Sequence, residues 1–377
     1  MKEITKHFYL PNEASVQEPA IANGSNLLVP EGHISELLSL DEIGILKNQF
    51  ATDMEEVAPD LRSNELAQHY ADSLFHTLVN NGARTLEQLV MAGSQEFHHV
   101  GKYVLGPLAV SFVDAALKDS HGKAIFPARD ATPFFYIAKA LKTLDPTTYH
   151  LQIDDIQNPV FNRKLWGIED EQDPENHVLS ITNPLVQRLL SQMGFFASNQ
   201  PKSFIEVGCW GSMVDQLNQA MQEGNIPIEE YSVYFLYTHL PNSIYGFMNI
   251  YGNNVPESAL ETIADTWEAF PKFFRRPTKL VEDGGVVKAS LEGKLVESPF
   301  LQTWTLSALQ GVVDAAIDFV VKKQIINPQD EILRLWELSN RAKSGEFTGI
   351  LPGHTETWTE GEAWRENWKW GKIPPLK

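Results

Sequence analysis

The sequence predicts an α/β fold, with a parallel sheet and helical N-terminal and C-terminal regions. Two short apolar segments, KAIFPARD at 123–130 and SFIEVGCWGS at 203–212, end in polar residues, as a strand does where it enters a loop. Each is followed by a segment with apolar positions at helical spacing. A third segment, YSVYFLYTH at 231–239, is rich in the aromatic residues that favour strands. Strands that alternate with helices indicate a parallel sheet covered by helices on both faces.

The composition bounds the class of protein. The chain has 377 residues, of which 43% are hydrophobic and 21% charged, as in ordinary globular proteins. This length allows two domains at roughly 150 residues each. A formal charge of -19 argues against a general nucleic-acid or anionic-membrane binder, because binding to phosphates needs a basic face. The single cysteine, Cys209, excludes an intrachain disulfide and a multi-cysteine zinc site.

Location is also an expectation from sequence. The start, MKEITKHFYLPNE, lacks the apolar stretch of a secretory leader. No run approaches the roughly 18 apolar residues of a membrane span. We therefore expect a soluble, cytoplasmic protein that binds neither nucleic acid nor membrane, and a homo-oligomer is compatible with these observations.

The N-terminal third is expected to be mainly helical. In residues 1–33, prolines and glycines interrupt any period, so this segment is predicted to be an irregular arm. Residues 34–121 show helical spacing of apolar positions, and Thr85 is placed to open one of the helices. The last and longest helix contains Pro107, which should kink or restart it, and Gly122 is a natural stop.

Residues 122–255 are predicted to form the α/β core, with a Rossmann-like parallel sheet. TPFFYIAKALKTL reads as the helix after the first strand, and TTYHLQI at 147–153 as a further strand. Residues 256–350 form a second helical region, interrupted by a hairpin or loop at 281–295. Residues 351–377 form a tail whose tryptophans are expected to dock on the body of the protein.

The first candidate loop is AIFPARDATP, residues 124–133. Ligands bind outside the carboxyl ends of parallel strands, where Arg129 and Asp130 are expected. Asp130 could bind Mg²⁺, act as a base or orient a sugar hydroxyl, and the planar guanidinium of Arg129 suits a phosphate. An ion pair between the two residues that only tethers the loop is the alternative.

The second candidate loop is FIEVGCWGSM, residues 204–213. A strand ends at Glu206, and Gly208 and Gly211 would let backbone N–H groups approach an anion at the start of a helix. Ser212 could donate to a phosphate oxygen or act only as an N-cap. Cys209, in the same loop, reads as a small half-buried residue rather than a nucleophile.

A third candidate is NPVFNRKLWG, residues 158–167. Its cations Arg163 and Lys164 could complete a phosphate site on an otherwise acidic protein. The alternative is a surface turn held by Trp166.

These segments resemble a family of bacterial proteins with the pattern LGP…F…(F/Y)FLARDG. Members often accompany glycosyltransferase genes and are commonly assigned to the haloacid-dehalogenase-like hydrolases. The family's second hallmark, DIGWxGS, is similar to residues 206–212, and its middle Arg segment is similar to FNRKLWG. A later QxG…F pattern matches Gln310, Gly311 and Phe319, so the resemblance covers roughly residues 100–320 in a consistent order.

The same two hallmarks are similar to the ARAGTP-like turn and DGWTGKG-like loop of phosphoribosyltransferase-type proteins. This resemblance implies that Asp130 and Glu206 are the catalytic and Mg²⁺-binding acids. It also implies a set of residues that bind the substrate and its phosphate: Arg129, Thr132, Arg163, Gly208, Trp210, Gly211 and Ser212.

The departures from both patterns keep alternatives open. Ala131 stands where the family has the glycine of RDG, and Val207 follows Glu206 where a second acid is usual. Ala128 occupies the place of the nucleophilic acid of the DxDxT pattern. The leading expectation is an enzyme that acts on a small phosphorylated sugar or nucleotide by phosphoribosyltransferase-like transfer. A phosphate-ester hydrolase and a non-catalytic ligand- or partner-binding module are the alternatives.

Overall fold

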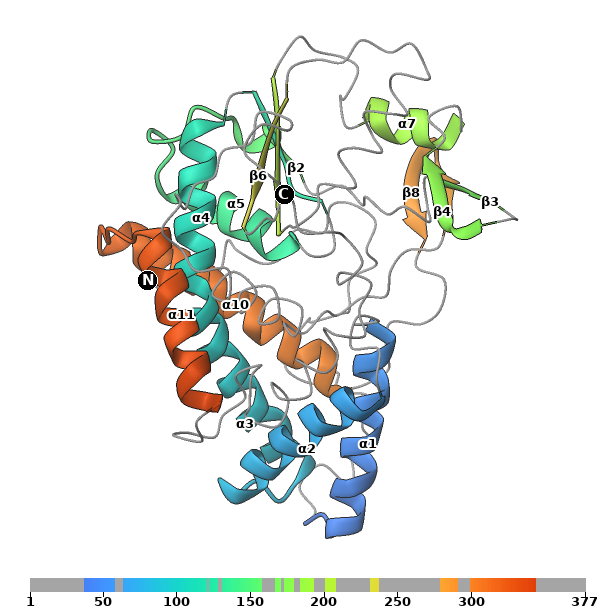
Figure 1. Ribbon diagram of the computed structural model, residues 1–377, viewed down its shortest axis with the longest axis vertical. Helices are drawn as coiled ribbons and strands as arrows, with labels where there is room; N and C mark the ends of the chain where they lie inside the picture. The colour runs from blue at the N-terminus through green and yellow to red at the C-terminus, as the bar shows by residue number, and fades with distance from the viewer. Residues whose placement is uncertain are drawn as a thin grey trace, which may run out of the picture. The chain divides into compact units, whose positions relative to one another are not determined.

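The computed structural model describes the chain in ranges that are separated by gaps: residues 37–57, 64–120, 122–127, 131–157, 167–170, 173–179, 184–192, 201–207, 231–236, 279–290 and 299–343. These residues form helices and a four-stranded parallel sheet, so the predicted α/β character is confirmed (Figure 1). The chain divides into two compact units. Of the described residues, those within Val113–Asn249 and Arg276–Lys294 belong to the sheet unit, and those within Val29–Phe112 and Leu295–Lys377 belong to the helical unit.

The parallel sheet is the centre of the sheet unit. Its strands lie in the order β2-β1-β5-β6, with bounds Ile156–Gln157, Lys123–Ile125, Lys202–Glu206 and Tyr231–Phe235. All neighbouring pairs are parallel, and Ile125 lies in register with both Gln157 and Phe204. β1 and β5 are the two inner strands, and the strands predicted at 123–130, 203–212 and 231–239 are all present.

Apolar residues explain why the inner strands are central. Ala124, Ile125, Phe204 and Ile205 are all 2% exposed or less, so both faces of β1 and β5 are covered. A parallel sheet is typically buried in this way, and its strands read as near-continuous apolar runs. Helix α5, Thr132–Leu144, follows β1 as predicted and lies beside β2 (Figure 1).

The prediction of a strand over TTYHLQI is wrong. Residues 146–148 form a turn, and the next strand is β2 at Ile156–Gln157, after the 3-10 turn η3 at Ile153–Asp155. The Asp145 carboxylate accepts hydrogen bonds from the hydroxyls of Thr147 and Thr148, at 3.0 and 2.5 Å. Such local side-chain bonds favour a turn over an extended strand, although threonine favours strands by propensity.

The sheet unit also contains two antiparallel hairpins. One joins β3, Gly167–Asp170, to β4, Asp173–Leu179, and was not predicted. The other joins β7, Lys279–Asp283, to β8, Val286–Ser290, and overlaps the segment 281–295 that was predicted as a hairpin or loop, beginning two residues earlier. Its turn is Gly284–Gly285, with φ of 56° and 82°, which other residues rarely adopt. Helix α7, Pro184–Gln192, contacts this hairpin and carries Arg188, which donates to both oxygens of Glu282 at 2.6 and 2.7 Å.

The helical unit has a core of aromatic rings. It contains α1, α2, α3, α10 and α11, with bounds Leu40–Val57, Asn64–Asn80, Leu86–His99, Pro299–Val321 and Pro328–Lys343. Trp304 on α10 is fully buried and has Phe50, Phe97 and Phe300 within 5.5 Å between ring centroids. The predicted start at Thr85 is confirmed, because its side chain and that of Gln88 form a capping box.

Pro107 lies next to a change of helix type. The π-helix η2, Val100–Leu105, passes directly into α4, Gly106–Asp119, so the helix continues through Pro107, and the restart expected from the sequence does not occur. Pro107 has no N–H to donate to the carbonyl four residues earlier, which favours the wider turn. Gly101 and Gly311 let α10 approach this segment closely, since an added Cβ at either would collide with the backbone of the other helix.

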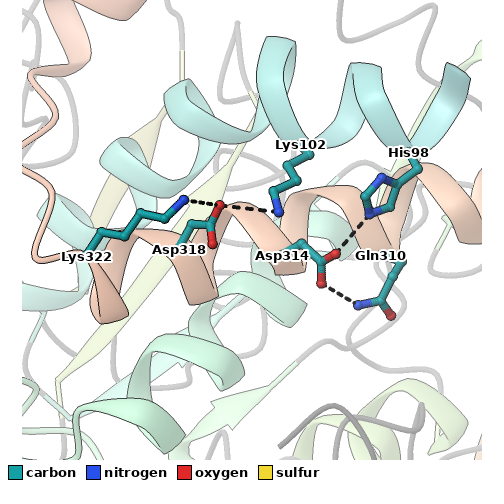
Figure 2. A network of polar contacts seen from close by, with 6 residues as sticks. All are labelled: His98, Lys102, Gln310, Asp314, Asp318 and Lys322. Carbon is teal, nitrogen blue, oxygen red and sulfur yellow. Dashed lines mark hydrogen bonds and ion pairs between the residues drawn. The ribbon is translucent and has the colours of Figure 1, made fainter. Parts of the chain in front are cut away.

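Polar contacts link the same two helices along one side (Figure 2). His98 contacts Asp314 through Nε2 at 2.9 Å, and Gln310 donates to the other oxygen of Asp314 at 2.8 Å. One turn further on, Asp318 contacts Lys102 at 3.3 Å and Lys322 at 2.9 Å. The adjacent His99 instead lies against the ring of Tyr103, so the two histidines have separate surroundings.

Asp318 gives this helix pair an expected pH dependence. The hydrogen bond from Lys322, and then that from Lys102, holds the pKa of Asp318 below its ordinary value. A depressed native pKa adds stability above the unfolded pKa of about 3.9, and this stability is lost as pH falls through the native pKa.

The difference in unfolding free energy between wild type and Asp318→Asn should therefore be full at pH 7 and shrink below about pH 4. Urea unfolding at pH 7, 5 and 3 measures it, with Asp330→Asn on α11 as the control for a lost charge. A constant difference across this range would contradict the assignment.

Two helical segments among the described residues meet the length and composition of a membrane span. They are Leu86–Asp119 and Thr303–Val321, and 72% and 50% of their apolar windows are buried inside the protein. Buried core helices of soluble proteins have the same length and composition. The expected cytoplasmic location stays a prediction.

Candidate functional site

The strand order singles out one point on the carboxyl edge of the sheet. From β1 the chain moves to β2 on one side, and from β5 it moves to β6 on the other side. The direction of winding therefore reverses between the neighbouring strands β1 and β5. In open α/β sheets, ligands bind in the crevice outside the carboxyl ends of the strands at this kind of reversal. The two predicted loops leave these same two strands.

The loop after β1 leads directly into helix α5. The N–H of Ala131 donates to the carbonyl of Pro127 at 3.2 Å, which turns the chain from strand to helix. Ala131 is the N-cap residue and makes no side-chain cap, and Pro133, at the start of the helix, has no N–H. The N-terminus of α5 therefore lies at the carboxyl end of β1 without a side-chain cap. A helix N-terminus favours a bound anion, because its N–H groups point outward and its dipole is positive there.

The backbone conformation at Ala131 explains why alanine can stand where the RDG pattern has glycine. Its φ is -86° and its ψ 6°, a conformation that alanine adopts without strain. A glycine is not required at this position, so the exchange leaves the turn intact.

Thr132 is the first residue of α5 and one of the predicted phosphate-binding residues. It is 5% exposed, and within the described part of the chain its Oγ1 has no hydrogen-bond partner. Burying a hydroxyl without a partner costs about 1–3 kcal/mol. A buried, unpartnered donor at a helix N-terminus is the arrangement expected of a group that hydrogen-bonds a ligand.

Glu206 is the last residue of β5 and is 7% exposed. Its backbone carbonyl accepts from the N–H of Leu236 at 3.0 Å, so the end of the strand is fixed. A carboxylate is rarely buried to this degree, and such groups cluster at functional sites. Glu206 therefore lies where the sequence predicted a catalytic acid, on the strand next to β1.

Gln157 was not predicted. It is the last residue of β2, and in the described residues its buried Oε1 has no hydrogen-bond partner. Gln157 is in register with Ile125, which is in register with Phe204, two residues before Glu206. Because side chains alternate along a strand, Gln157 and Glu206 share one face of the sheet. The strand was predicted at 147–153 instead of Ile156–Gln157, so Gln157 was not recognised as the end of a strand.

Charged groups on α5 fix the segment that leads to Gln157. The Lys139 ammonium donates to the carbonyl of Ile153 at 2.6 Å, which ties η3 to the helix. Burial lowers the pKa of Lys139, and the charge of Asp154 opposes this shift. Burial also raises the pKa of Tyr136 on the same helix. The Lys139 contact therefore fixes the turn that directly precedes β2.

The other predicted site residues lie outside the described residues: Arg129, Asp130, Arg163, Gly208, Trp210, Gly211 and Ser212. In sequence, Asp130 directly precedes Ala131, and Gly208 directly follows Val207. The structure thus places Glu206 at the end of β5 and Thr132 at the start of the helix that follows the neighbouring strand β1, and adds Gln157.

The oxygen donors at this edge suit a hard cation. Mg²⁺ takes carboxylate, carbonyl and water oxygens and is often held by one or two carboxylates together with substrate phosphates. Glu206 supplies a buried carboxylate of this kind. No group of three or more metal-ligating residues occurs in the part of the chain that the structure describes, and Asp130, the second predicted ligand, is outside it.

No protein-family model matches the chain, and no curated protein sequence matches it. The two family resemblances therefore remain hypotheses.

Proposed function

We propose that this protein is an enzyme that acts on a phosphorylated sugar or nucleotide by phosphoribosyltransferase-like transfer. One observation carries the proposal: the reversal of strand order falls between β1 and β5, the strands that enter the two predicted loops. The sheet order corresponds to 2-1-3-4 when its strands are renumbered in sequence, as in doubly wound, Rossmann-like sheets that bind nucleotides at this reversal.

The proposed site has a phosphate position and an acidic position. The N-terminus of α5 and the Thr132 hydroxyl donate to the phosphate, and Arg129 adds a cation from the same loop. Gly208, Gly211 and Ser212 of the second loop hold further phosphate oxygens. Glu206 and Asp130 would hold Mg²⁺, which when bound neutralises charge on the phosphates.

In the transfer, the bond from the anomeric carbon of the sugar to pyrophosphate breaks, and the pyrophosphate leaves with the electron pair. The acceptor forms a new bond to that carbon and gives up a proton to water. Glu206 stabilises the positive charge that develops on the sugar, because a buried carboxylate acts strongly in a water-poor site. Little covalent chemistry is required of the protein, and positioning supplies much of the rate.

Two other functions fit the same fold less well. A haloacid-dehalogenase-like hydrolase needs an acid nucleophile, and Ala128 stands in its place. A non-catalytic ligand- or partner-binding module would retain the phosphate position without chemistry. The buried acid Glu206 favours an enzyme, since the transfer mechanism needs an acid at this strand end and phosphate binding alone does not.

A thermal-shift screen tests the proposal. The panel contains phosphoribosyl pyrophosphate, nucleoside mono- and diphosphates, sugar phosphates and phosphate, each with and without Mg²⁺. At a hundredfold excess over Kd, a ligand stabilises the native state by about 2.7 kcal/mol, and each kcal/mol raises Tm by about 2–4 °C. We expect a Mg²⁺-dependent rise with one phosphorylated class, which Asp130→Asn removes and the exposed control Glu282→Gln retains.

The same screen separates the alternatives. A shift that does not need Mg²⁺ and survives Asp130→Asn would favour the binding module. No shift with any member of the panel would contradict the proposed substrate class.

A further inference from the structure

We propose that Gln157 is a specificity-determining residue, whose Oε1 accepts a hydrogen bond from a hydroxyl group of the phosphorylated sugar. This inference rests on the proposed function and names the part of the substrate that the β2 side of the site recognises. It starts from three residues near the carboxyl edge of the sheet: Gln157 at the end of β2, Glu206 at the end of β5, and Thr132 at the start of the helix that follows β1.

The backbone of Gln157 is held firmly. Its carbonyl accepts from the N–H of Phe126 at 2.8 Å, and the residue pairs in register with Ile125 on β1. The preceding turn is tied to α5 through the bond from Lys139 to Ile153. A fixed backbone limits the positions that the side-chain amide can reach, which is a requirement for recognition.

The side chain of Gln157, in contrast, carries an acceptor oxygen whose hydrogen-bonding capacity is not used within the described part of the chain. Oε1 of Gln157 is buried, and the described residues offer it no hydrogen-bond partner. An apolar residue of similar shape would avoid this cost, because a buried polar atom without a partner destabilises the native state. Buried polar atoms without a partner are typical of functional sites, where residues are kept for binding or catalysis although other residues would make the native state more stable.

The chemistry of the acceptor selects the ligand group. A fully ionised phosphate has no hydrogen to donate, so Oε1 of Gln157 does not suit the phosphate itself. The phosphate position lies instead at the N-terminus of α5, where Thr132 and the helix dipole supply donors. A sugar hydroxyl can donate to Oε1, and a hydroxyl is the neutral donor that every phosphorylated sugar carries.

The spacing fits a sugar phosphate. Gln157 and Glu206 share one face of the sheet and lie on the two strands that flank β1. Neighbouring strands are about 4.8 Å apart, and Glu206 lies two residues beyond the position in register with Gln157, so the two side chains begin about 12 Å apart. A substrate whose phosphate sits at the end of β1 can therefore reach Glu206 with its reacting carbon and Gln157 with a hydroxyl.

The substitution Gln157→Met tests this role, because methionine has nearly the same length and no acceptor of comparable strength. Two quantities are measured: the urea midpoint of unfolding, and the affinity for ribose 5-phosphate by titration calorimetry with Mg²⁺. We expect a midpoint at or above that of wild type and an affinity about tenfold weaker, which corresponds to 1.4 kcal/mol. A residue with a purely structural role would show the opposite pair of effects.

Deoxy analogues of ribose 5-phosphate identify the hydroxyl. One analogue should bind wild type about tenfold more weakly than the parent sugar, and Gln157→Met should not weaken it further. Gln152→Met, at an exposed position five residues earlier, is the matched control and should bind as wild type does. Thr132→Val should instead weaken every phosphorylated ligand alike, including the deoxy analogues.

Two failures are distinguishable. If wild type binds the panel and Gln157→Met binds equally well, the role of Gln157 is overturned and the proposed function stands. If wild type binds no phosphorylated compound, the proposed function fails, and this inference fails with it.

Discussion

Glu206→Gln is expected to lower turnover of the phosphorylated substrate about 100-fold while leaving the fold intact. The carboxylate is 7% exposed at the end of β5, beside the point where the strand order reverses. Glutamine keeps the shape of the side chain and removes its charge. A positioned acid or base contributes about 10²–10⁴-fold to rate, and charge acts most strongly in a buried site. The loss should appear in kcat, because the charge stabilises the transition state more than the bound substrate.

The control for this experiment is Glu282→Gln. Glu282 is an exposed carboxylate on β7 that accepts two hydrogen bonds from Arg188. The substitution makes the same change of charge on a two-stranded sheet that is separate from the parallel sheet, so turnover should stay at the wild-type level. Equal activity of wild type and Glu206→Gln would show that Glu206 is a structural residue, and the transfer mechanism would be wrong.

Trp304→Ala is expected to destabilise the helical unit by about 3–5 kcal/mol, the usual cost of truncating a buried large aromatic residue. Trp304 is fully buried, and its ring lies 4.8 Å from Phe300, 5.2 Å from Phe50 and 5.5 Å from Phe97 between centroids. Its Nε1 donates to the carbonyl of Val90 at 3.0 Å. Alanine would leave a cavity lined by residues of α1, α3 and α10, which cannot close without movement of these helices.

Urea unfolding followed by circular dichroism measures this loss. Ile325→Ala is the control, because Ile325 is 99% exposed and its truncation should change the unfolding free energy by less than about 0.5 kcal/mol. A loss below about 1 kcal/mol for Trp304→Ala would mean that the aromatic cluster is not the core of this unit.

Local signals explain why much of the fold could be predicted. The capping box at Thr85, the strand over 123–125 and the helix over 132–144 depend on residues that are close in sequence. The strand expected over 147–153 does not form, because Thr147 and Thr148 donate hydrogen bonds to the Asp145 carboxylate and so stabilise a turn. β2 itself has two residues, too few for a pattern of alternating side chains to appear.

The candidate site was predictable only in part, because it depends on which strands are neighbours. Glu206 ends an apolar run and Thr132 begins a segment with helical spacing, so their places at a strand end and a helix start could be expected from the sequence. That β1 and β5 are adjacent is a long-range property, and it is this pairing that places the reversal of strand order between the two loops. Gln157 enters the site only through the pairing of β2 with β1, for which the sequence carries no local signal.

Hydrogen exchange measured by mass spectrometry tests the central claim, which is that a phosphorylated substrate binds at the carboxyl ends of β1 and β5. The exchange of backbone amides is followed with and without the Mg²⁺-dependent ligand that the thermal-shift screen identifies. We expect slower exchange in peptides that cover residues 126–136, 153–158 and 204–212, and no change in the β7–β8 hairpin. Protection confined to that hairpin or to the helical unit would contradict the account, because the ligand would then bind away from the reversal of strand order.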